Sequence, residues 1–513
     1  MTADAKGGRQ ATLVTGATGL IGHHVLAHLL RSGRRCAVLL RSPLSDTWDR
    51  LSGLLWELGF DADGLRAATQ LIPLEGSLGE GVPALRGFSV RSVVHAAAST
   101  RFNADGDGDP WRTNVDGTQN LLDWASAAGA REFHYVGSAY ACGRTAIPVA
   151  EAPYPSEPEF HNDYERSKWH AERLCMRWAQ ADGRSLTVFR PSVVVGEYAS
   201  GRSTRFAGIY LLARATELLD RTFRHADEST RRSIPLRIRA RADESQNIVP
   251  VDYVGRVIAA IVAEPEHHGR VYHVTNGNPP SNRLFKEALE QFFGIGGGRF
   301  VEAADFPRDD LNEHEQRFYD ASRSIEHYFV DSPTFDRSHT AGVEQRAGIA
   351  CPAYDCAALG RLFAYAQSAN WGRPRGSRFS SVPGCSSYFE SFLPSHVGRS
   401  RIARMTALSA TIRFVIDDEL DGCWTCRFER GRLAAVRRGW NDGKADFGYR
   451  STKEVFWEAI SGTTHPQELF LSGRAELFGD IEAALKMAMI LHDFTKEFPC
   501  LPLPANPSAP AKA

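Results

Sequence analysis

Short apolar runs alternate with helix-length amphipathic segments over the first 195 residues of the chain. The runs have the length and the Val, Leu and Ile content of buried strands, and the segments between them have helical period. Strands that are separated by helices run parallel to one another in a sheet. The pattern therefore predicts the α/β class, with a doubly wound parallel sheet. The expected strands are Ala11–Thr15, Cys36–Leu40, Leu71–Leu74, Val90–Ala98, Glu132–Ser138 and Ser185–Val195.

The pattern changes further along the chain. Residues from about 196 to 370 mix helical and strand patterns and are rich in Arg, which predicts a substrate lobe interleaved with the sheet. Residues 1–370 are therefore expected to form one domain, whose Rossmann core covers about 11–195. Residues 371–394 are rich in Gly, Pro and Ser and predict a linker. Residues 395–500 predict a small α+β domain, and the Pro- and Ala-rich residues 501–513 a disordered tail. The elements expected in the α+β domain are the strands Thr411–Ile416, Trp424–Phe428, Leu433–Arg437 and Leu469–Ser472, a helix from Thr452 and an amphipathic helix near Ile481–Phe494.

Composition and charge argue against several classes of partner. The 60 Lys and Arg residues balance 61 Asp and Glu residues, so no global field attracts nucleic acid. No apolar run reaches the roughly 18 residues of a membrane span, and Met1–Gln10 lacks the apolar core of a signal peptide. The nine cysteines are scattered, and the close pair Cys423 and Cys426 has no second pair at zinc spacing. We therefore expect a soluble, cytoplasmic protein with reduced thiols, no membrane span, no nucleic-acid partner and no metal.

A glycine-rich turn follows the first expected strand. The segment Gly16-Ala-Thr-Gly19-Leu-Ile-Gly22 leads into a helical pattern, where glycines permit a tight turn and bring backbone N–H groups to a pyrophosphate. This context favours a dinucleotide site over a simple strand-to-helix turn. At the end of the second strand, Arg41 stands where an acidic residue would accept from a ribose 2′-hydroxyl, and it could pair with a 2′-phosphate. NADPH is therefore expected rather than NADH; the alternative role for Arg41 is solubility.

A tyrosine and a lysine open a later helical pattern. In Tyr164-Glu-Arg-Ser-Lys168 the spacing places both side chains on one helix face, where the ammonium can lower the pKa of the phenol. Such a phenol can act as a general acid toward a carbonyl oxygen. Ser138 ends the fifth expected strand, at the sheet edge where doubly wound folds bind ligands. These three residues are the predicted catalytic group, although Tyr-x-x-x-Lys alone also occurs by chance on helix surfaces.

With these residues in view, the chain over about 11–370 resembles the extended short-chain dehydrogenase/reductases, which have a Rossmann sheet, and most specifically the fatty acyl-CoA reductase and thioester-reductase group. The resemblance is carried by Thr15 to Gly22, His95-Ala-Ala-Ala98 with Phe102, Asn114 to Thr118, Gly137 to Tyr140, Tyr164 to Trp169, Arg190 to Gly196, Val249 to Val254 and Phe335-Asp336. The chain departs from the family at Glu75-Gly-Ser-Leu78, where Ser77 replaces an Asp that usually faces the adenine.

The resemblance implies a role for each site residue. Ser138 would polarise the carbonyl, Tyr164 would protonate it, and Lys168 would tune Tyr164 and hold the nicotinamide ribose. Asn114 would be a structural or proton-relay residue. The implied cofactor-binding residues are Thr15, Gly16, Thr18, Gly19, Leu20, Ile21, Gly22, Arg41, Ala96, Ala97, Ala98, Asn114, Pro191 and Val193.

Residues 395–500 resemble the sterol carrier protein type of lipid-binding domain. The resemblance is carried by Gly422 to Phe428, Asp446 to Phe456, Phe470 to Arg474, Gly479-Asp480 and Leu485-Lys486. A twisted sheet flanked by an apolar helix can leave a dry tunnel for an acyl chain or a sterol. The expected lining is Phe478, Ile481, Leu485, Met489 and Phe494, although such a stripe is also typical of plain core.

A row of arginines lies in the expected substrate lobe. Arg237, Arg239 and Arg241 alternate with apolar residues, so a strand would place all three on one face. They could meet the phosphates of CoA or of an acyl carrier protein's phosphopantetheine. The alternative is a solvated edge strand, since charged side chains commonly protect such edges.

Three functions fit these patterns. The first is NADPH-dependent reduction of a hydrophobic acyl thioester, bound to CoA or to an acyl carrier protein, to an aldehyde and on to an alcohol, with the lipid-binding domain assisting. The second is an NAD(P)-dependent 3-hydroxysteroid or sterol dehydrogenase with the same catalytic group. The third is a lipid-binding module with a nucleotide-sensing scaffold. A homodimer is compatible with all three.

Overall fold

The computed structural model divides into two compact units, 1–373 and 374–513. It describes residues 9–500 apart from 146, 182, 225, 303–304, 307–309, 330–331, 373–383, 408, 418, 420–421, 440–444, 463, 472–473 and 499. The tail expected over 501–513 lies outside the described residues. Within them, no helix combines the length and the apolar character that a bilayer crossing requires.

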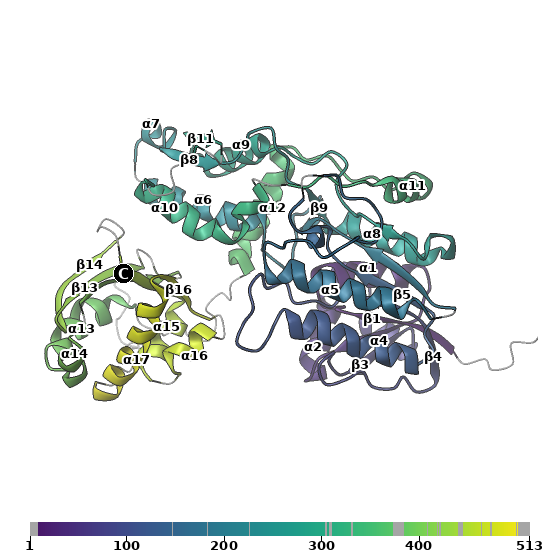
Figure 1. Cartoon of the computed structure of the whole chain (residues 1–513), viewed down its shortest axis with the longest axis horizontal. Coiled ribbons are helices and arrows are strands. Elements are labelled where there is room, and N and C mark those ends of the chain that lie inside the picture. Colours follow the sequence, from purple (N-terminus) through teal and green to yellow (C-terminus); the bar gives the residue numbers. More distant parts are fainter. Residues whose placement is uncertain are drawn as a thin grey trace, which may run out of the picture. The chain divides into compact units, whose positions relative to one another are not determined.

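The N-terminal unit is built on a seven-stranded sheet, which is parallel throughout and has the order β10-β6-β5-β4-β1-β2-β3 (Figure 1). Its strands are β1 (Arg9–Thr15), β2 (Cys36–Leu40), β3 (Leu71–Glu75), β4 (Phe88–His95), β5 (Glu132–Val136), β6 (Ser185–Phe189) and β10 (Val271–Tyr272). The prediction of a doubly wound parallel sheet is therefore confirmed. Because the chain winds outward in both directions from β1 and β4, a crevice for a ligand lies at the carboxyl ends of these two strands.

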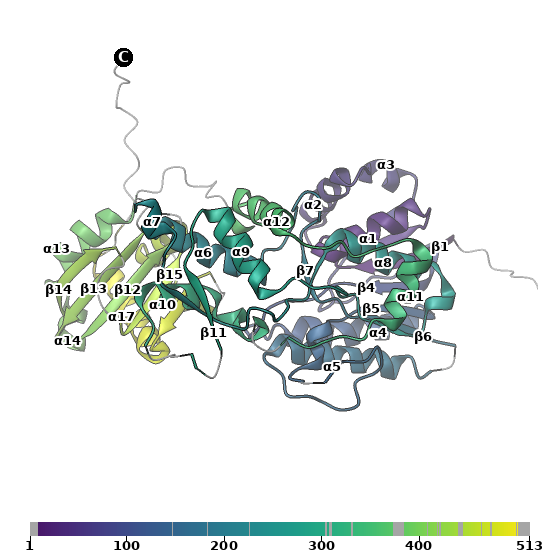
Figure 2. The ribbon, with the colours of Figure 1, turned by 90° about the horizontal axis from the view of Figure 1, so that it is seen from above.

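Helices cover both faces of this sheet, as Figure 2 shows, with α1 and α8 on one face and α4 and α5 on the other. The side of α1 and α8 is strongly apolar, and the residues at its centre, such as Val25, Val257 and Ile261, are fully buried. The helices of this core are α1 (Leu20–Arg31), α2 (Leu44–Glu57), α3 (Ala62–Ala67), α4 (Gly117–Ala127), α5 (Asp163–Trp178), α8 (Val251–Ala263) and α11 (Ser338–Ala347), with the shorter turns η1 (Arg112–Asp116), η2 (Ala139–Cys142) and η3 (Pro265–His267).

A second hydrophobic core forms the substrate lobe of the same unit. It is built from α6 (Ile209–Phe223), α7 (Glu228–Arg231), α9 (Asn282–Phe293), α10 (Glu313–Ser322), η4 (Arg323–Phe329), α12 (Cys356–Ser368) and η5 (Asn370–Gly372), and from the parallel strand pairs β7 (Val193–Val195) with β9 (Ile248–Pro250) and β8 (Leu236–Arg239) with β11 (Gly298–Val301). The single strand expected over Ser185–Val195 is thus two strands, because the chain leaves the main sheet after Phe189 and β7 joins the lobe.

The C-terminal unit has a five-stranded mixed sheet of order β14-β13-β12-β15-β16. Only the β12–β15 pair is parallel. Trp424 is fully buried and stacks on Phe389, with 4.7 Å between the ring centroids. Its elements are η6 (Tyr388–Phe392), α13 (Leu393–Val397), α14 (Arg401–Thr406), β12 (Ala410–Ile416), β13 (Cys423–Glu429), β14 (Arg432–Arg438), β15 (Phe447–Ser451), α15 (Lys453–Ile460), α16 (Pro466–Leu471), β16 (Glu476–Gly479) and α17 (Ile481–Glu497).

Two expectations are wrong in detail. Of the strand expected over Leu469–Ser472, Leu469–Leu471 belong to helix α16, and the strand at this point of the sheet is β16. Part of the expected linker, residues 373–383, lies outside the described residues, but 385–394 belong to the C-terminal unit, since Tyr388 and Phe389 are buried in its core. The Ser-rich composition before them concealed this apolar group.

Because Phe389 is fully buried against Trp424, we expect Phe389→Ala to destabilise the C-terminal unit by roughly 3–5 kcal/mol. Urea unfolding of the full chain, followed by tryptophan fluorescence, measures the change. Met489→Ala is the control, because the Met489 side chain is 56% exposed and its loss should cost less than about 0.5 kcal/mol. Equal stability of the two variants would place Phe389 outside the folded unit.

Candidate active site

The glycine turn lies at the crevice between β1 and β4. Gly16 has a φ of 71°, and a Cβ on it would lie 2.5 Å from the Ala97 nitrogen. A Cβ on Gly22 would lie 2.0 Å from the Gly16 oxygen. Neither position accepts a side chain, so the turn packs directly on the Ala96–Ala97 backbone and exposes N–H groups at the start of α1. This cradle fits a pyrophosphate, which helix N-termini bind through the same groups.

Thr15 and His95 support the turn from the buried side. Thr15 Oγ1 lies 2.7 Å from His95 Nδ1 and accepts a hydrogen bond from the Ala97 N–H at 3.3 Å. His95 Nε2 lies 3.0 Å from Thr118 Oγ1. Burial lowers the pKa of His95 to about 3, so the ring is neutral near pH 7. Its two nitrogens form hydrogen bonds with the hydroxyls of Thr15 and Thr118. The half-buried segment Ala96–Ala98 is thereby fixed along the glycine turn.

The other implied cofactor contacts surround the same crevice. Thr18, Gly19, Leu20 and Ile21 are half-buried in the turn and the first turn of α1, and Arg41 is exposed after β2. The ends of β5 and β6 are joined there, since the Ala139 N–H donates to the Pro191 carbonyl at 2.9 Å.

Ser138 lies at the carboxyl edge of the sheet, two residues after the end of β5. It is 5% exposed and caps η2, with its Oγ accepting a hydrogen bond from the Tyr140 N–H at 3.2 Å. Its hydroxyl is near enough to Tyr164 to lower the pKa of that phenol. The structure thus brings two of the predicted catalytic residues to the same place.

Tyr164 lies in the first turn of α5, with its ring edge-on to Phe102 at 6.3 Å between centroids. Burial raises its pKa to about 12, and the nearby Ser138 hydroxyl opposes this rise. The direction is opposite to the lowering expected from Lys168. A raised pKa keeps the phenol protonated at neutral pH, which is the form that a proton donor needs.

Lys168 is buried beneath Tyr164 on the same helix, with 2% of its surface exposed. Its Nζ donates to the Val136 carbonyl at 2.7 Å and lies 4.5 Å from the centre of the Tyr135 ring. Burial lowers the pKa of Lys168 to about 8, against the opposing charges of Cys175 and Glu172. The ammonium is bound to the end of β5, which explains why it does not depress the pKa of Tyr164.

Asn114 connects the crevice to the catalytic helix. Its Nδ2 donates to the Ser99 carbonyl and to Ser167 Oγ, both at 2.9 Å, and its Oδ1 accepts from the Ser99 N–H at 2.8 Å. Both amide hydrogens are therefore used in positioning the Ser99 backbone against α5.

Sequence reasoning missed a buried polar group beside Tyr164. Glu165 is fully buried and accepts from the Tyr328 hydroxyl at 2.8 Å and from the His161 N–H at 2.9 Å. Asn162 caps α5 through the Glu165 N–H and also donates to the Tyr328 hydroxyl at 3.2 Å. The Asn-x-x-Glu spacing at the start of a helix is a capping signal that could have revealed Glu165, whereas the contact with Tyr328 spans 163 residues.

Three arginines gather near the end of β2. Partial desolvation and the positive charges of Arg50 and Arg41 lower the pKa of Arg205. All three side chains are exposed, and no ion pair is recorded for them within the described part of the chain. Like charges that remain unneutralised at one place form a site for an anion.

The arginine row of the substrate lobe does not form such a site. Arg237 pairs with the buried Glu315 at 2.6 Å, and Arg239 pairs with Glu326 at 2.8 Å. Arg241 is more exposed and lies 3.7 Å from Asp243. The guanidinium groups of Arg237 and Arg239 are neutralised within the lobe, so the expected phosphate-binding face is not available.

A wide polar cleft opens on the substrate side of the sheet, with a volume of about 830 Å³. Its walls include Arg144, His161, Asn247 and Arg337. Phe335 lines the cleft and packs edge-on against Tyr140, with 5.9 Å between ring centroids. One wall of the cleft therefore packs against Tyr140, which follows Ser138 by two positions.

Three potential metal ligands, Glu132, His134 and His268, come within 4.8 Å of one another. They lie at the amino end of β5, whereas Ser138 follows its carboxyl end. This group is separate from the catalytic residues.

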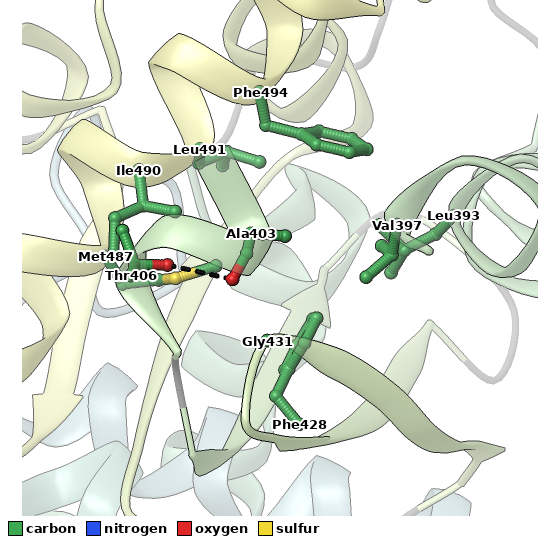
Figure 3. Close-up of a pocket in the computed structure, with 10 residues that line it drawn as sticks. All are labelled: Leu393, Val397, Ala403, Thr406, Phe428, Gly431, Met487, Ile490, Leu491 and Phe494. Atoms are coloured by element: carbon green, nitrogen blue, oxygen red, sulfur yellow. Dashed lines mark hydrogen bonds between the residues drawn. The ribbon is translucent and has the colours of Figure 1, made fainter. Parts of the chain in front are cut away.

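The C-terminal unit holds an apolar cavity of about 30 Å³ (Figure 3). Figure 3 shows Met487, Ile490, Leu491 and Phe494 of α17 facing residues of α13, α14 and β13. Of the expected lining only Phe494 takes part, since Met489 and Ile481 are 56% and 42% exposed. The helix is rotated relative to the stripe that the sequence suggested.

The fold and the site define the N-terminal unit as an NAD(P)-dependent oxidoreductase domain. Residues 14–258 match the family model "Male sterility protein", an NAD-binding type, and residues 393–492 match the SCP-2 sterol transfer family. Residues 14–258 are therefore similar to male sterility-type NAD-binding domains, and residues 393–492 are similar to SCP-2-type domains.

Relatives of known name agree with the oxidoreductase class. The chain is 28% identical to the aldehyde reductase lnaA of Aspergillus flavus over 56% of its own length and 27% of the relative's. It is 27% identical to the non-canonical nonribosomal peptide synthetase FrzA of Cladobotryum sp over 53% of its own length and 26% of the relative's. The chain thus spans about a quarter of these two proteins.

Solved reductase domains share the fold. The terminal R domain of the myxalamid PKS-NRPS pathway has a TM-score of 0.57 at 19% identity, covering 72% of this chain and 92% of that domain. A thiolation-reductase di-domain of an archaeal nonribosomal peptide synthetase has a TM-score of 0.56 at 21% identity, covering 71% and 76%.

The pKa of Lys168 predicts a pH limit. Since the ammonium loses its proton as the pH rises through about 8, we expect kcat/KM for reduction to fall above that pH. The test is the rate of NADPH oxidation from about pH 6 to about pH 10. Lys168→Arg should show lower activity without this decline, because a guanidinium stays charged over the range. A wild-type profile that stays flat to the alkaline end would contradict the assignment.

Proposed function

We propose that the protein reduces hydrophobic acyl thioesters to aldehydes with NADPH. The observation that carries this proposal is the position of Ser138, after β5 at the carboxyl edge of the sheet, near Tyr164 in the first turn of α5, together with the glycine turn that fits a dinucleotide. The male sterility-type match and the similarity to an aldehyde reductase support the same chemistry. One round of reduction releases an aldehyde, and a second round would give the alcohol.

The side chains have distinct tasks in this mechanism. NADPH, when bound, supplies the hydride. The Ser138 hydroxyl polarises the thioester carbonyl, and Tyr164 donates its phenolic proton to the carbonyl oxygen, which gives a hemithioacetal. Loss of the thiol from this adduct yields the aldehyde. Lys168, whose ammonium is bound to the Val136 carbonyl at the end of β5, would hold the nicotinamide ribose.

The polar cleft suits the non-acyl part of a thioester. A CoA or phosphopantetheine arm carries amides and phosphate, and the cleft offers Arg144, Asn247 and Asn276 in about 830 Å³. The Arg144 guanidinium lies 3.4 Å from the exposed Glu159 and is itself 56% exposed, so it is accessible to a phosphate. This replaces the arginine row of the substrate lobe as the proposed phosphate contact. The similarity to a thiolation-reductase di-domain supports an acyl carrier partner.

A sterol dehydrogenase is the second candidate, because the C-terminal unit matches the SCP-2 sterol transfer family. The catalytic group would then reduce a ketone, and no thiol would be released. A ketosteroid has no group that needs a long polar cleft, so the cleft favours the thioester.

Cofactor choice follows from the three arginines near β2. We expect Arg41→Ala to weaken binding of 2′,5′-ADP about 10- to 100-fold, as loss of a charged hydrogen bond would, with 5′-ADP unaffected. Isothermal titration measures both ligands. Arg9→Ala is the matched control, since Arg9 lies at the amino end of β1, away from the glycine turn. Equal loss for both nucleotides would show that Arg41 does not recognise the 2′-phosphate.

The decisive variant is Tyr164→Phe. We expect NADPH-dependent turnover of a long-chain acyl-CoA to fall by about 10²- to 10⁴-fold, because the proton donor is lost, while NADPH binding is retained. Tyr272→Phe is the control, since it removes a buried hydroxyl that donates only to the His267 carbonyl among the described residues. Unchanged turnover in Tyr164→Phe would refute the mechanism.

Product analysis separates the candidates. Aldehyde or alcohol together with free CoA, identified by mass spectrometry, supports thioester reduction. Turnover of a 3-ketosteroid alone would favour the sterol dehydrogenase, and NADPH binding without either reaction would favour a nucleotide-sensing scaffold.

A further inference from the structure

The substrate lobe contains a second, apolar cavity of about 60 Å³. It lies between β8, β11, α9 and α10, and its walls include Phe285, Leu289, Phe300 and Phe318. This exceeds the roughly 10–15 Å³ that one water requires, but a cavity walled by rings and aliphatic chains offers water few partners. Protein interiors are otherwise close-packed, so unfilled apolar space of this size is suited to an apolar ligand.

The cavity connects to the catalytic residues through apolar side chains. Leu212 and Phe329 line it and also pack against the buried cluster of Tyr140, Ile325 and Tyr328. The ring of Tyr328 lies 4.8 Å from that of Tyr140, which follows Ser138 by two residues.

The ring of Tyr328 is also connected to Tyr164 through Phe102. Tyr328 lies 6.0 Å from Phe102, and Phe102 lies 6.3 Å from Tyr164, measured between ring centroids. On the other side, Phe329 lies 6.4 Å from Phe285 in the wall of the cavity. Aromatic contacts therefore run from Tyr164 to Tyr328, and the next residue in the chain, Phe329, lies in the wall of the cavity.

We propose that this cavity binds the distal part of the substrate's acyl chain. The inference rests on the proposed thioester reductase function and names its substrate class as acyl groups with an uncharged alkyl or aryl end. The polar cleft and the apolar cavity then serve opposite ends of one substrate, because Phe335 and Phe329 both pack against the cluster that contains Tyr140. The carbonyl between the two ends would lie at Ser138.

The polar groups at the rim of the cavity favour an acyl chain whose end is uncharged. Arg239 and Glu326 line it but are paired with each other at 2.8 Å. Asn282 is buried, and its Nδ2 donates to the Arg241 carbonyl at 2.8 Å. Lys286 also lines the cavity and pairs with Glu290 at 2.8 Å. A terminal carboxylate or ammonium would have to compete with these ion pairs, whereas a methyl or phenyl group would lose only water contact.

Ala240 offers a direct test, because it lines the cavity with a small side chain and is 3% exposed. Ala240→Leu fills space without adding a polar atom. We expect kcat/KM for dodecanoyl-CoA to fall at least about 10-fold, the effect of excluding one or two methylenes, with hexanoyl-CoA changed less than about 2-fold. Ala347→Leu adds the same volume at an exposed position of α11 and should change neither. An unchanged ratio of the two substrates in folded Ala240→Leu would overturn the proposal.

A second variant protects the test against misfolding. Phe300→Ala enlarges the same cavity, so the preference should move toward longer chains. Folding of both variants is checked by thermal melting, and a preference that stays at the wild-type chain length in Phe300→Ala would also overturn the proposal.

A readout without turnover separates this inference from the proposed function. Dodecanoyl-CoA with a diazirine on its terminal carbon is photolysed with the full-length protein and NADP⁺, and the labelled peptides are identified by mass spectrometry. Labels on β8, α9 or α10 that disappear in Ala240→Leu support the cavity even if no reduction is found. Labels confined to residues 393–492 would assign the chain to the SCP-2-type unit and refute the cavity.

Discussion

The arrangement of the predicted catalytic residues depends on one buried contact, the hydrogen bond from Lys168 to the Val136 carbonyl. It joins α5 to the end of β5, and these two elements carry Tyr164 and Ser138. Removing an ammonium from water costs free energy. Here the Val136 carbonyl and the face of the Tyr135 ring offset part of that cost. The buried pair of Glu172 with Arg190, 2.5 Å apart, joins α5 to the chain after β6 in the same way. The catalytic helix is thus held by charges that never reach solvent.

Much of the N-terminal unit could be predicted from the sequence, because residues that are close together in the chain determine its strands and its glycine turn. Strand β2 is a continuous apolar run and β1 and β4 contain shorter ones, and Gly16 and Gly22 stand where a Cβ would collide with backbone. The contact of Tyr328 with Glu165 could not be predicted, because the two residues are far apart in the chain and neither carries a motif. The internal pairing of Arg237 with Glu315 was hidden for the same reason.

The C-terminal unit shows where periodicity is insufficient. Helix α17 is apolar on more than one side, so its sequence does not determine which stripe faces inward. Its cavity of about 30 Å³ is far below the roughly 300 Å³ at which binding sites for whole small molecules begin. The cavity between α17, α13 and α14 therefore does not have room for a whole lipid.

The hydrogen bond between Tyr328 and Glu165 has a consequence for acid strength. Glu165 adjoins Tyr164 in the chain, and its negative charge raises the pKa of that phenol. The Tyr328 hydroxyl donates to this carboxylate from η4, a segment of the substrate lobe. If an arriving ligand displaces η4, the carboxylate loses a donor, its charge acts more strongly on Tyr164, and the proton is held more tightly. A ligand that leaves η4 in place keeps the phenol more acidic. The hydrogen bond thereby links the acidity of Tyr164 to the position of η4.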